Sequence, residues 1–184
     1  MGFHTFDVER AEQLEDPARF RYCSAEELRA AVSAAEGETV LDVGSGTGFY
    51  TEIVAADAGA VIAFDLQTEM HELYRENDPD ESVSFVTGGA DSLPFDADSI
   101  DAAFSTMTYH EFATAASLSE LHRVLRPGGR LVTIDWDGNG PEEAGPPNDE
   151  RYGLGEAASA MDAAGFRIAA AERRVETMLI LAIA

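Results

Sequence analysis

A glycine-rich turn between an apolar strand and a helix constrains the fold of this chain more than any other feature. The residues from Val40 to Thr51 read VLDVGSGTGFYT, and a second apolar segment, AVIAFD, ends at Asp65. Glycines allow a sharp bend and a close approach of a ligand to the backbone, and the N–H groups at the start of the following helix favour an anionic ligand group. The pattern predicts a nucleotide-type pocket at the first turn of a doubly wound sheet, with Asp65 binding ribose hydroxyls.

The spacing of the glycines bears on which cofactor this pocket holds. They stand at Gly44, Gly46 and Gly48, whereas the dinucleotide fingerprint G-x-G-x-x-G would place its third glycine at the position of Phe49. Asp42 directly precedes the turn, and its carboxylate would repel a pyrophosphate but tolerate a ligand with an ammonium and a sulfonium group. A tight strand-to-helix connection without a ligand is the alternative. The flanking aspartates favour an adenosine-containing cofactor.

The chain is strongly acidic. Among 184 residues, 35 are Asp or Glu against 12 basic residues, all arginine, and the net charge is −23. Nucleic acid and anionic membranes would be repelled, so we expect neither as a partner. Because the acidic residues are spread among apolar segments, the pattern is typical of a halophilic protein whose self-repulsion is screened in high salt.

Other global features predict a cytoplasmic protein without a metal site. No segment approaches the ~18 apolar residues that span a membrane, and the N-terminus lacks a basic-then-apolar signal. Cys23 is the only cysteine, which excludes an internal disulfide and a cysteine-rich metal site. The histidines and carboxylates show no metal-ligand spacing, so we expect no metal.

Strand and helix patterns alternate along the chain, which predicts βαβ units and a largely parallel sheet. The segment that joins the last two strands, 172–177, is too short for a crossover helix, so these strands must pair antiparallel. The fold class is therefore α/β: a doubly wound, mostly parallel seven-stranded sheet with an antiparallel C-terminal hairpin and helices on both faces. Strands are expected at 39–43, 60–64, 83–87, 100–105, 130–136, 166–171 and 178–184, and helices at 7–20, 24–36, 50–58, 68–75, 113–125 and 155–164.

We expect a single domain over residues 1–184. It divides into an N-terminal helical segment (1–36), a cofactor-binding core (37–136), a loop (137–152) and a C-terminal helix with the hairpin (153–184).

Four blocks of the sequence together resemble the small-molecule class I (Rossmann-like) S-adenosylmethionine-dependent methyltransferases, especially the group that includes the quinone-biosynthesis C-methyltransferases. They cover roughly Val40 to Trp136 and read VLDVGSGTGFYT, FDLQTEM, GGADSLPFDADSIDAAFS and LHRVLRPGGRLVTIDW. The resemblance is specific for the superfamily and not for the substrate. It implies S-adenosylmethionine as cofactor and methyl transfer to a small-molecule acceptor, in a monomer or homodimer.

The resemblance also implies roles for individual residues at the carboxyl ends of the strands. The residues of the glycine turn would surround the methionine half of the cofactor. Asp65 would bind the ribose hydroxyls, with the next residue beside the adenine. Asp91 would accept a hydrogen bond from the adenine amino group, and Ser105 and Thr106 would close the pocket. Turn capping or ordinary strand-end packing is the alternative for the later residues. In chain order the implied cofactor-binding set is Asp42, Gly44, Ser45, Gly46, Gly48, Asp65, Leu66, Asp91, Ser92, Ser105 and Thr106.

The chemistry requires alignment of the reacting groups, and a base only if the acceptor must first lose a proton. In the segment TYHEF after the fourth strand, His110 is the candidate base, because its unperturbed pKa lies near neutrality. Tyr109 is the second candidate and would line the acceptor pocket. The alternative for His110 is packing against the helix start or positioning the cofactor. Tyr22 and Phe20 would also line this pocket, and Arg151 would pair with an acidic acceptor or form a surface salt bridge.

Two other functions remain open at this point. A module that binds or senses S-adenosylmethionine without catalysis would carry the same cofactor motif. An NAD-dependent oxidoreductase is disfavoured by Phe49 and Asp42, and the chain has no lysine for the catalytic Tyr/Lys set common in such enzymes.

Overall fold

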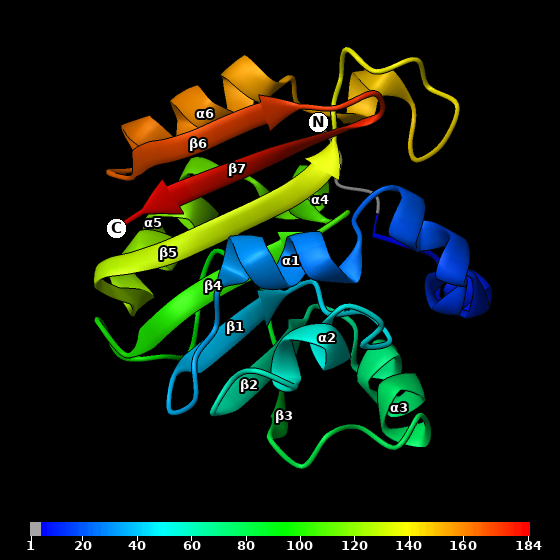
Figure 1. The fold of residues 1–184 in the computed structure, drawn as a ribbon, viewed down its shortest axis with the longest axis vertical. Coiled ribbons are helices and arrows are strands. Elements are labelled where there is room, and N and C mark those ends of the chain that lie inside the picture. The colour runs from blue at the N-terminus through cyan, green and yellow to red at the C-terminus, as the bar shows by residue number, and fades with distance from the viewer. Residues whose placement is uncertain (1–4) are drawn as a thin grey trace.

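Seven strands form one sheet in the computed structural model, which describes residues 5–184 (Figure 1). The strands are β1 (Thr39–Val43), β2 (Ala60–Asp65), β3 (Val83–Thr87), β4 (Ile100–Thr106), β5 (Leu125–Trp136), β6 (Arg167–Arg173) and β7 (Thr177–Ile183). Their order across the sheet is β3-β2-β1-β4-β5-β7-β6, and β7 pairs antiparallel with both β5 and β6 while the other pairs are parallel. The predicted fold class and its C-terminal hairpin are confirmed.

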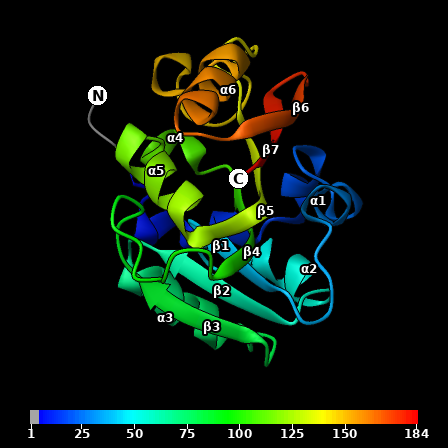
Figure 2. The ribbon, with the colours of Figure 1, turned by 90° about the vertical axis from the view of Figure 1, so that its left-hand side faces the viewer.

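Helices cover both faces of this sheet. Figure 2 shows α1 and α2 on one side and α4, α5 and α6 on the other. The helices are α1 (Ala25–Val32), α2 (Thr51–Ala55), α3 (Thr68–Glu76), α4 (Tyr109–Phe112), α5 (Ala115–Val124) and α6 (Leu154–Ala163), with three short 3₁₀ helices, η1 (Val8–Glu15), η2 (Pro17–Arg21) and η3 (Asn148–Glu150).

Two buried clusters, one on each face, explain why the central strands are almost wholly apolar. Val40 packs in the cluster with α1 and α2, whereas its neighbour Leu41 packs in the cluster with α5 and α6. Successive side chains of a strand point to opposite faces, so a strand covered on both sides needs apolar residues throughout.

The first difference from the sequence prediction lies in the helices before β1. Helix α1 is capped by Ser24, whose hydroxyl accepts the Glu27 N–H at 3.2 Å, as predicted. It ends at Val32 rather than Glu36, because Ser33 adopts the left-handed conformation, with φ 48°. The expected leading helix is two 3₁₀ helices, since Pro17 starts a new helix capped by Asp16.

The second difference lies around the fourth and fifth strands. Strand β5 begins at Leu125, directly after α5 and five residues before the predicted start at Arg130, because Leu125 already pairs with Ile100 of β4. Helix α4 was not predicted, and its four residues are too few to show helical periodicity. This short helix places residues of the candidate site beside the carboxyl end of β5.

No helix within residues 5–184 is both long and apolar enough to cross a membrane.

Candidate functional site

A cavity of about 910 Å³ lies at the carboxyl ends of β1, β2, β4 and β5. In open α/β sheets ligands bind at this edge, and the volume lies within the usual range for small-molecule pockets. Eight of the predicted site residues line it: Gly44, Ser45, Gly46, Asp65, Leu66, Asp91, Thr106 and His110.

The other predicted residues lie near the cavity without lining it. Gly48 packs against the ring of Tyr74, and Ser92 is an exposed turn residue. Ser105 is fully buried, with its hydroxyl 3.5 Å from that of Thr133. Asp42 and Tyr109 are described below.

The glycine turn requires glycine for two reasons. Gly44 and Gly46 have φ +79° and +54°, in the left-handed region that favours glycine. A Cβ on Gly44 would lie 2.2 Å from Cγ2 of Thr108, the residue that precedes α4. The Thr108 hydroxyl donates to the carbonyls of Thr106 and Gly44 at 3.0 and 3.3 Å. The first turn of the sheet is therefore in direct contact with the turn after β4.

Asp42 is buried behind this turn with only part of its hydrogen-bonding capacity used. Its Oδ2 accepts the Thr51 hydroxyl at 2.6 Å, whereas Oδ1 has no partner. Burial is the main cause that raises the pKa of Asp42 to about 7; the bond from Thr51 lowers it and the nearby Asp65 raises it. The Ser45 hydroxyl is likewise buried without a partner. A cationic ligand in the cavity would favour the ionised carboxylate, so this environment fits a group that carries positive charge.

Asp65 joins the ends of the first two strands. Its Oδ2 accepts the Gly46 N–H at 2.8 Å, and Oδ1 accepts the Gln67 N–H at 2.9 Å. A carboxylate has about four lone-pair sites, so two acceptor positions remain for a ligand. Because Asp65 also lines the cavity, its placement suits a ligand that carries hydroxyl groups.

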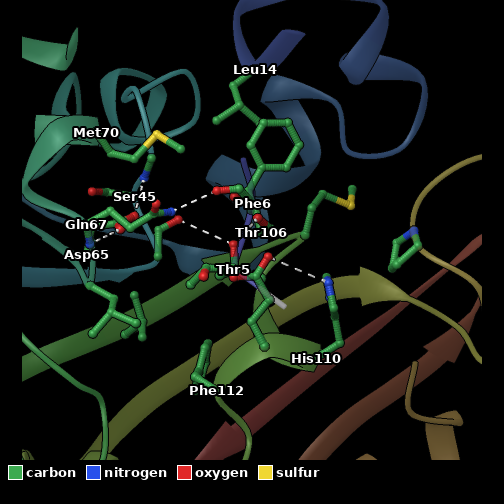
Figure 3. Close-up of a pocket in the computed structure, with 18 of the residues that line it drawn as sticks. Thr5, Phe6, Leu14, Ser45, Asp65, Gln67, Met70, Thr106, His110 and Phe112 are labelled. Atoms are coloured by element: carbon green, nitrogen blue, oxygen red, sulfur yellow. Dashed lines mark hydrogen bonds and ion pairs between the residues drawn. The ribbon is translucent and has the colours of Figure 1, made fainter. Parts of the chain in front are cut away.

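The N-terminal segment contributes a wall that sequence reasoning missed. Thr5 and Phe6 line the cavity, and the Gln67 side chain donates to the Phe6 carbonyl at 3.0 Å. Figure 3 shows Asp65 and Gln67 on one side of the cavity and His110 on the other, with Thr5 and Phe6 between them in this view. No residue pattern in this segment marks it in advance.

His110 lies on the cavity wall opposite Asp65 and is held by Asp135. The sequence prediction did not single out Asp135. The imidazole Nδ1 lies 3.0 Å from both carboxylate oxygens of Asp135, and the His110 backbone N–H donates to Oδ2 at 2.7 Å. Asp135 follows an apolar run at a strand end, as Asp42 and Asp65 do, and that shared pattern could have identified it.

Tyr109 packs away from the cavity. It is 1% exposed, its ring contacts Phe112 and Tyr152 at centroid distances of 5.7 Å, and its hydroxyl has no hydrogen-bond partner. Tyr109 therefore contacts neighbouring aromatic rings and does not line the cavity.

The loop over residues 137–152 is fastened to the cavity wall beside Trp136. Tyr22, Trp136 and residues 144–147 line the cavity there, whereas Phe20 does not. Arg151 is neither a surface residue nor a cavity residue. Its buried guanidinium donates to the carbonyls of Pro146, at 2.7 Å, and Ala144, and lies 3.5 Å from Glu176.

Comparisons with known proteins agree with this geometry. A family model described as "Methyltransferase domain" matches residues 41–133. A demethylmenaquinone methyltransferase from Clavibacter sepedonicus is 38% identical over 108 residues, which are 58% of this chain and 44% of that protein. The bifunctional biotin-biosynthesis protein BioHC from Cellvibrio japonicus is 41% identical over 92 residues, which are 50% of this chain and 18% of that protein. The chain thus spans less than half the length of these relatives.

Solved structures extend the similarity to nearly the whole chain. A SAM-dependent methyltransferase from Aquifex aeolicus superposes with a TM-score of 0.89 at 29% identity, covering 97% of this chain and 99% of that one. A geranyl diphosphate C-methyltransferase from Streptomyces coelicolor, solved with S-adenosyl-L-homocysteine, shares the fold with a TM-score of 0.75 at 18% identity, covering 98% and 84%.

Proposed function

Because the chain belongs to the methyltransferase domain family and has the Rossmann-like fold of its S-adenosylmethionine-dependent members, we propose that it transfers a methyl group from S-adenosylmethionine to a small-molecule acceptor. The observation that carries the proposal is the buried Asp42 carboxylate, whose Oδ1 has no partner, directly behind a glycine turn that lines the cavity. A ligand with ammonium and sulfonium groups suits this charge, and a pyrophosphate does not.

The cofactor-binding residues form two groups in this proposal. Backbone groups of the glycine turn, from Gly44 to Gly48, with Ser45 and Asp42, hold the methionine half. Asp65 holds the ribose hydroxyls with Leu66 beside the adenine, and Asp91 accepts a hydrogen bond from the adenine amino group, with Ser92 next to Asp91. Thr106 closes the pocket, with Ser105 buried behind it. When bound, the cofactor supplies a methyl group on a positively charged sulfur.

The acceptor lies, in this proposal, between His110 and the wall formed by Tyr22, Trp136 and residues 144–147. This wall is largely apolar and enclosed by the fastened loop, which favours a small molecule over a protein or nucleic acid segment. His110 is the one titratable side chain of the candidate catalytic pair that lines the cavity. We assign it the role of base.

Calorimetric titration in molar potassium chloride tests the cofactor. We expect S-adenosylmethionine and its demethylated product to bind, and NAD to bind more weakly. Asp65→Ala should weaken the binding of S-adenosylmethionine by roughly 1–3 kcal/mol, because hydrogen bonds to the ribose are lost. The control is Asp96→Ala, at an exposed aspartate outside the cavity. If NAD binds more tightly than S-adenosylmethionine, the cofactor assignment is wrong. If Asp65→Ala binds S-adenosylmethionine with unaltered affinity, the assignment of Asp65 to the ribose is wrong.

Catalysis is tested separately from binding, because a sensing module would also bind the cofactor. The protein is incubated with methyl-labelled S-adenosylmethionine and fractionated small-molecule extracts of a halophilic microbe. We expect label to enter a small organic product. Cofactor binding without any labelled product, in extracts that cover the main metabolite classes, would favour the sensing module.

A further inference from the structure

We infer that Asp135 is a positioning residue that keeps the His110 proton on Nδ1, so that Nε2 takes a proton from the methyl acceptor and passes it to Glu111. It follows that the acceptor carries a removable proton on the reacting atom: a phenol, a thiol or a carbon acid beside a carbonyl. The inference rests on the proposed function and names the substrate class of the same site.

Asp135 is fully buried and its carboxylate is surrounded by donors. Its Oδ1 accepts the Trp136 N–H at 2.8 Å and its Oδ2 accepts the His110 N–H at 2.7 Å, while the imidazole Nδ1 lies 3.0 Å from both oxygens. A carboxylate only accepts hydrogen bonds. Nδ1 must therefore carry a proton, and in the neutral imidazole Nε2 is then the acceptor.

Within residues 5–184, Glu111 is the one acid whose carboxylate lies within 4 Å of Nε2. Its Oε1 lies 3.9 Å from Nε2, and it lines the cavity together with His110, which Figure 3 shows. Their side chains are 10% and 16% exposed. The histidine nitrogen that faces the cavity thus has a carboxylate 3.9 Å away, a distance beyond a direct hydrogen bond, so a proton would pass between them through one water molecule.

The charges around His110 come from three elements. Burial lowers the pKa of His110, but Asp135 on β5, by charge and hydrogen bond, and Glu111 on α4 raise it above the ordinary value, against the opposing charge of Arg151 after η3. Burial also raises the pKa of Glu111 to about 7, with the charge of His110 opposing it. Both shifts therefore favour the protonated form, so each side chain holds its proton to a higher pH than the same group would in water.

The proposed step is a proton transfer that balances without any further reactant. The bond between the reacting atom of the acceptor and its hydrogen breaks, the proton moves to Nε2, and the electron pair stays on that atom as the nucleophile. Imidazolium is stabilised by the adjacent Asp135 carboxylate. It then returns to the neutral form by passing the Nε2 proton to the Glu111 carboxylate and from there to solvent. A reacting atom without a proton, such as a thioether sulfur, would not require these groups.

Nitrogen-15 NMR of the histidines tests the arrangement without an acceptor. In the wild-type protein we expect the neutral His110 ring to carry its proton on Nδ1; its signals are identified by their loss in His110→Gln. In Asp135→Asn one oxygen becomes an NH₂ group, so we expect a shift toward the Nε2-protonated form and a lower His110 pKa. His71 and His122 are internal controls, because neither contacts Asp135. Glu111→Gln should lower the His110 pKa without changing the tautomer.

The outcomes separate this inference from the proposed function. An Nε2-protonated ring in the wild-type protein would overturn the inference whether or not Asp135→Asn folds. So would a tautomer and pKa unchanged by Asp135→Asn. In the labelling experiment, label on a phenol oxygen, a thiol sulfur or a carbon beside a carbonyl supports the inference, and label on a thioether overturns it. Failure to bind S-adenosylmethionine would instead refute the proposed function while leaving the NMR result readable.

Discussion

Asp42 in β1 and Asp135 in β5 are both buried near the carboxyl ends of parallel strands, at 1% and 0% exposure, yet their surroundings differ. Asp42 accepts one side-chain hydrogen bond and has an oxygen without a partner. Asp135 accepts bonds from two backbone N–H groups and has an imidazole within 3.0 Å. The first carboxylate lacks partners that a ligand could supply, and the second is complete without one.

We interpret Asp42 as a carboxylate that binds a ligand and Asp135 as a carboxylate that positions another side chain. A buried charge with unused acceptors destabilises the free protein, and a ligand of opposite charge offsets that cost on binding. A carboxylate whose acceptors are filled instead fixes the geometry of its neighbours, here the ring of His110. The two roles predict different responses to substitution, pH and salt.

The largest effect is expected where the two turns touch. Gly44→Ala would place a Cβ 2.2 Å from Thr108 at a φ of +79°. Strain and the clash together should lower the free energy of unfolding by more than ~3 kcal/mol. Gly128→Ala is the matched control, with φ +81° and nothing within 4 Å of the new Cβ, and should cost about 1 kcal/mol. Urea unfolding in molar potassium chloride measures both; equal losses would show that the contact with Thr108 is unimportant.

Asp42→Asn should affect stability and binding in opposite directions. It removes a buried charge while an amide oxygen can still accept the Thr51 hydroxyl, so the ligand-free protein should gain ~1–3 kcal/mol near pH 8. Affinity for S-adenosylmethionine should fall about tenfold or more, because the attraction to its cationic groups is lost. Unfolding and calorimetry on the same preparation measure the two changes. A variant that is less stable and binds normally would make Asp42 a structural residue without a role in binding.

The pH dependence of stability should carry the signature of Asp42. Its folded-state pKa is raised to about 7 from an ordinary value of 3.8, so between these values the folded protein holds a proton that the unfolded chain releases. The contribution of Asp42 to stability is therefore present at low pH and is lost as pH rises toward 7. The pKa of Glu111 is also raised to about 7, so this group changes the stability in the same direction. Unfolding measured from pH 5 to pH 8 should show a shallower decline for Asp42→Asn than for wild type; parallel curves would contradict the assignment.

The smallest effect concerns salt. Self-repulsion at a net charge of −23 should be screened by potassium chloride, so wild type and Asp42→Asn should both melt at higher temperature in molar salt than in dilute buffer. A buried charge is screened much less, so the stability difference between the two proteins should change by less than ~0.5 kcal/mol. Thermal melts at several salt concentrations measure both quantities. Unchanged melting of wild type would remove the halophile interpretation, and a difference that disappears in salt would place Asp42 in contact with solvent.

Periodicity and connection length were enough to predict most of the fold. Val83–Thr87 was predicted to the residue, and the short link between the last two strands required the antiparallel hairpin that is present. Apart from helix α4, which was not predicted, and the leading segment, which forms two 3₁₀ helices, the errors lie at element ends. Ser33 terminates α1 by its backbone conformation, and Leu125 joins a strand by pairing with Ile100, and neither event depends on a pattern within the local sequence.

One part of the candidate site is built by a continuous segment and could be read from the residue pattern. A strand, a glycine turn and a helix follow one another there, so the spacing of Asp42, Gly44 and Gly46 predicts their arrangement. The other part could not be read in this way, because His110 contacts Asp135 and shares a cavity wall with Phe6 across long stretches of chain. The physical reason is that a partner for a buried polar group is chosen by packing in three dimensions, which local spacing does not encode.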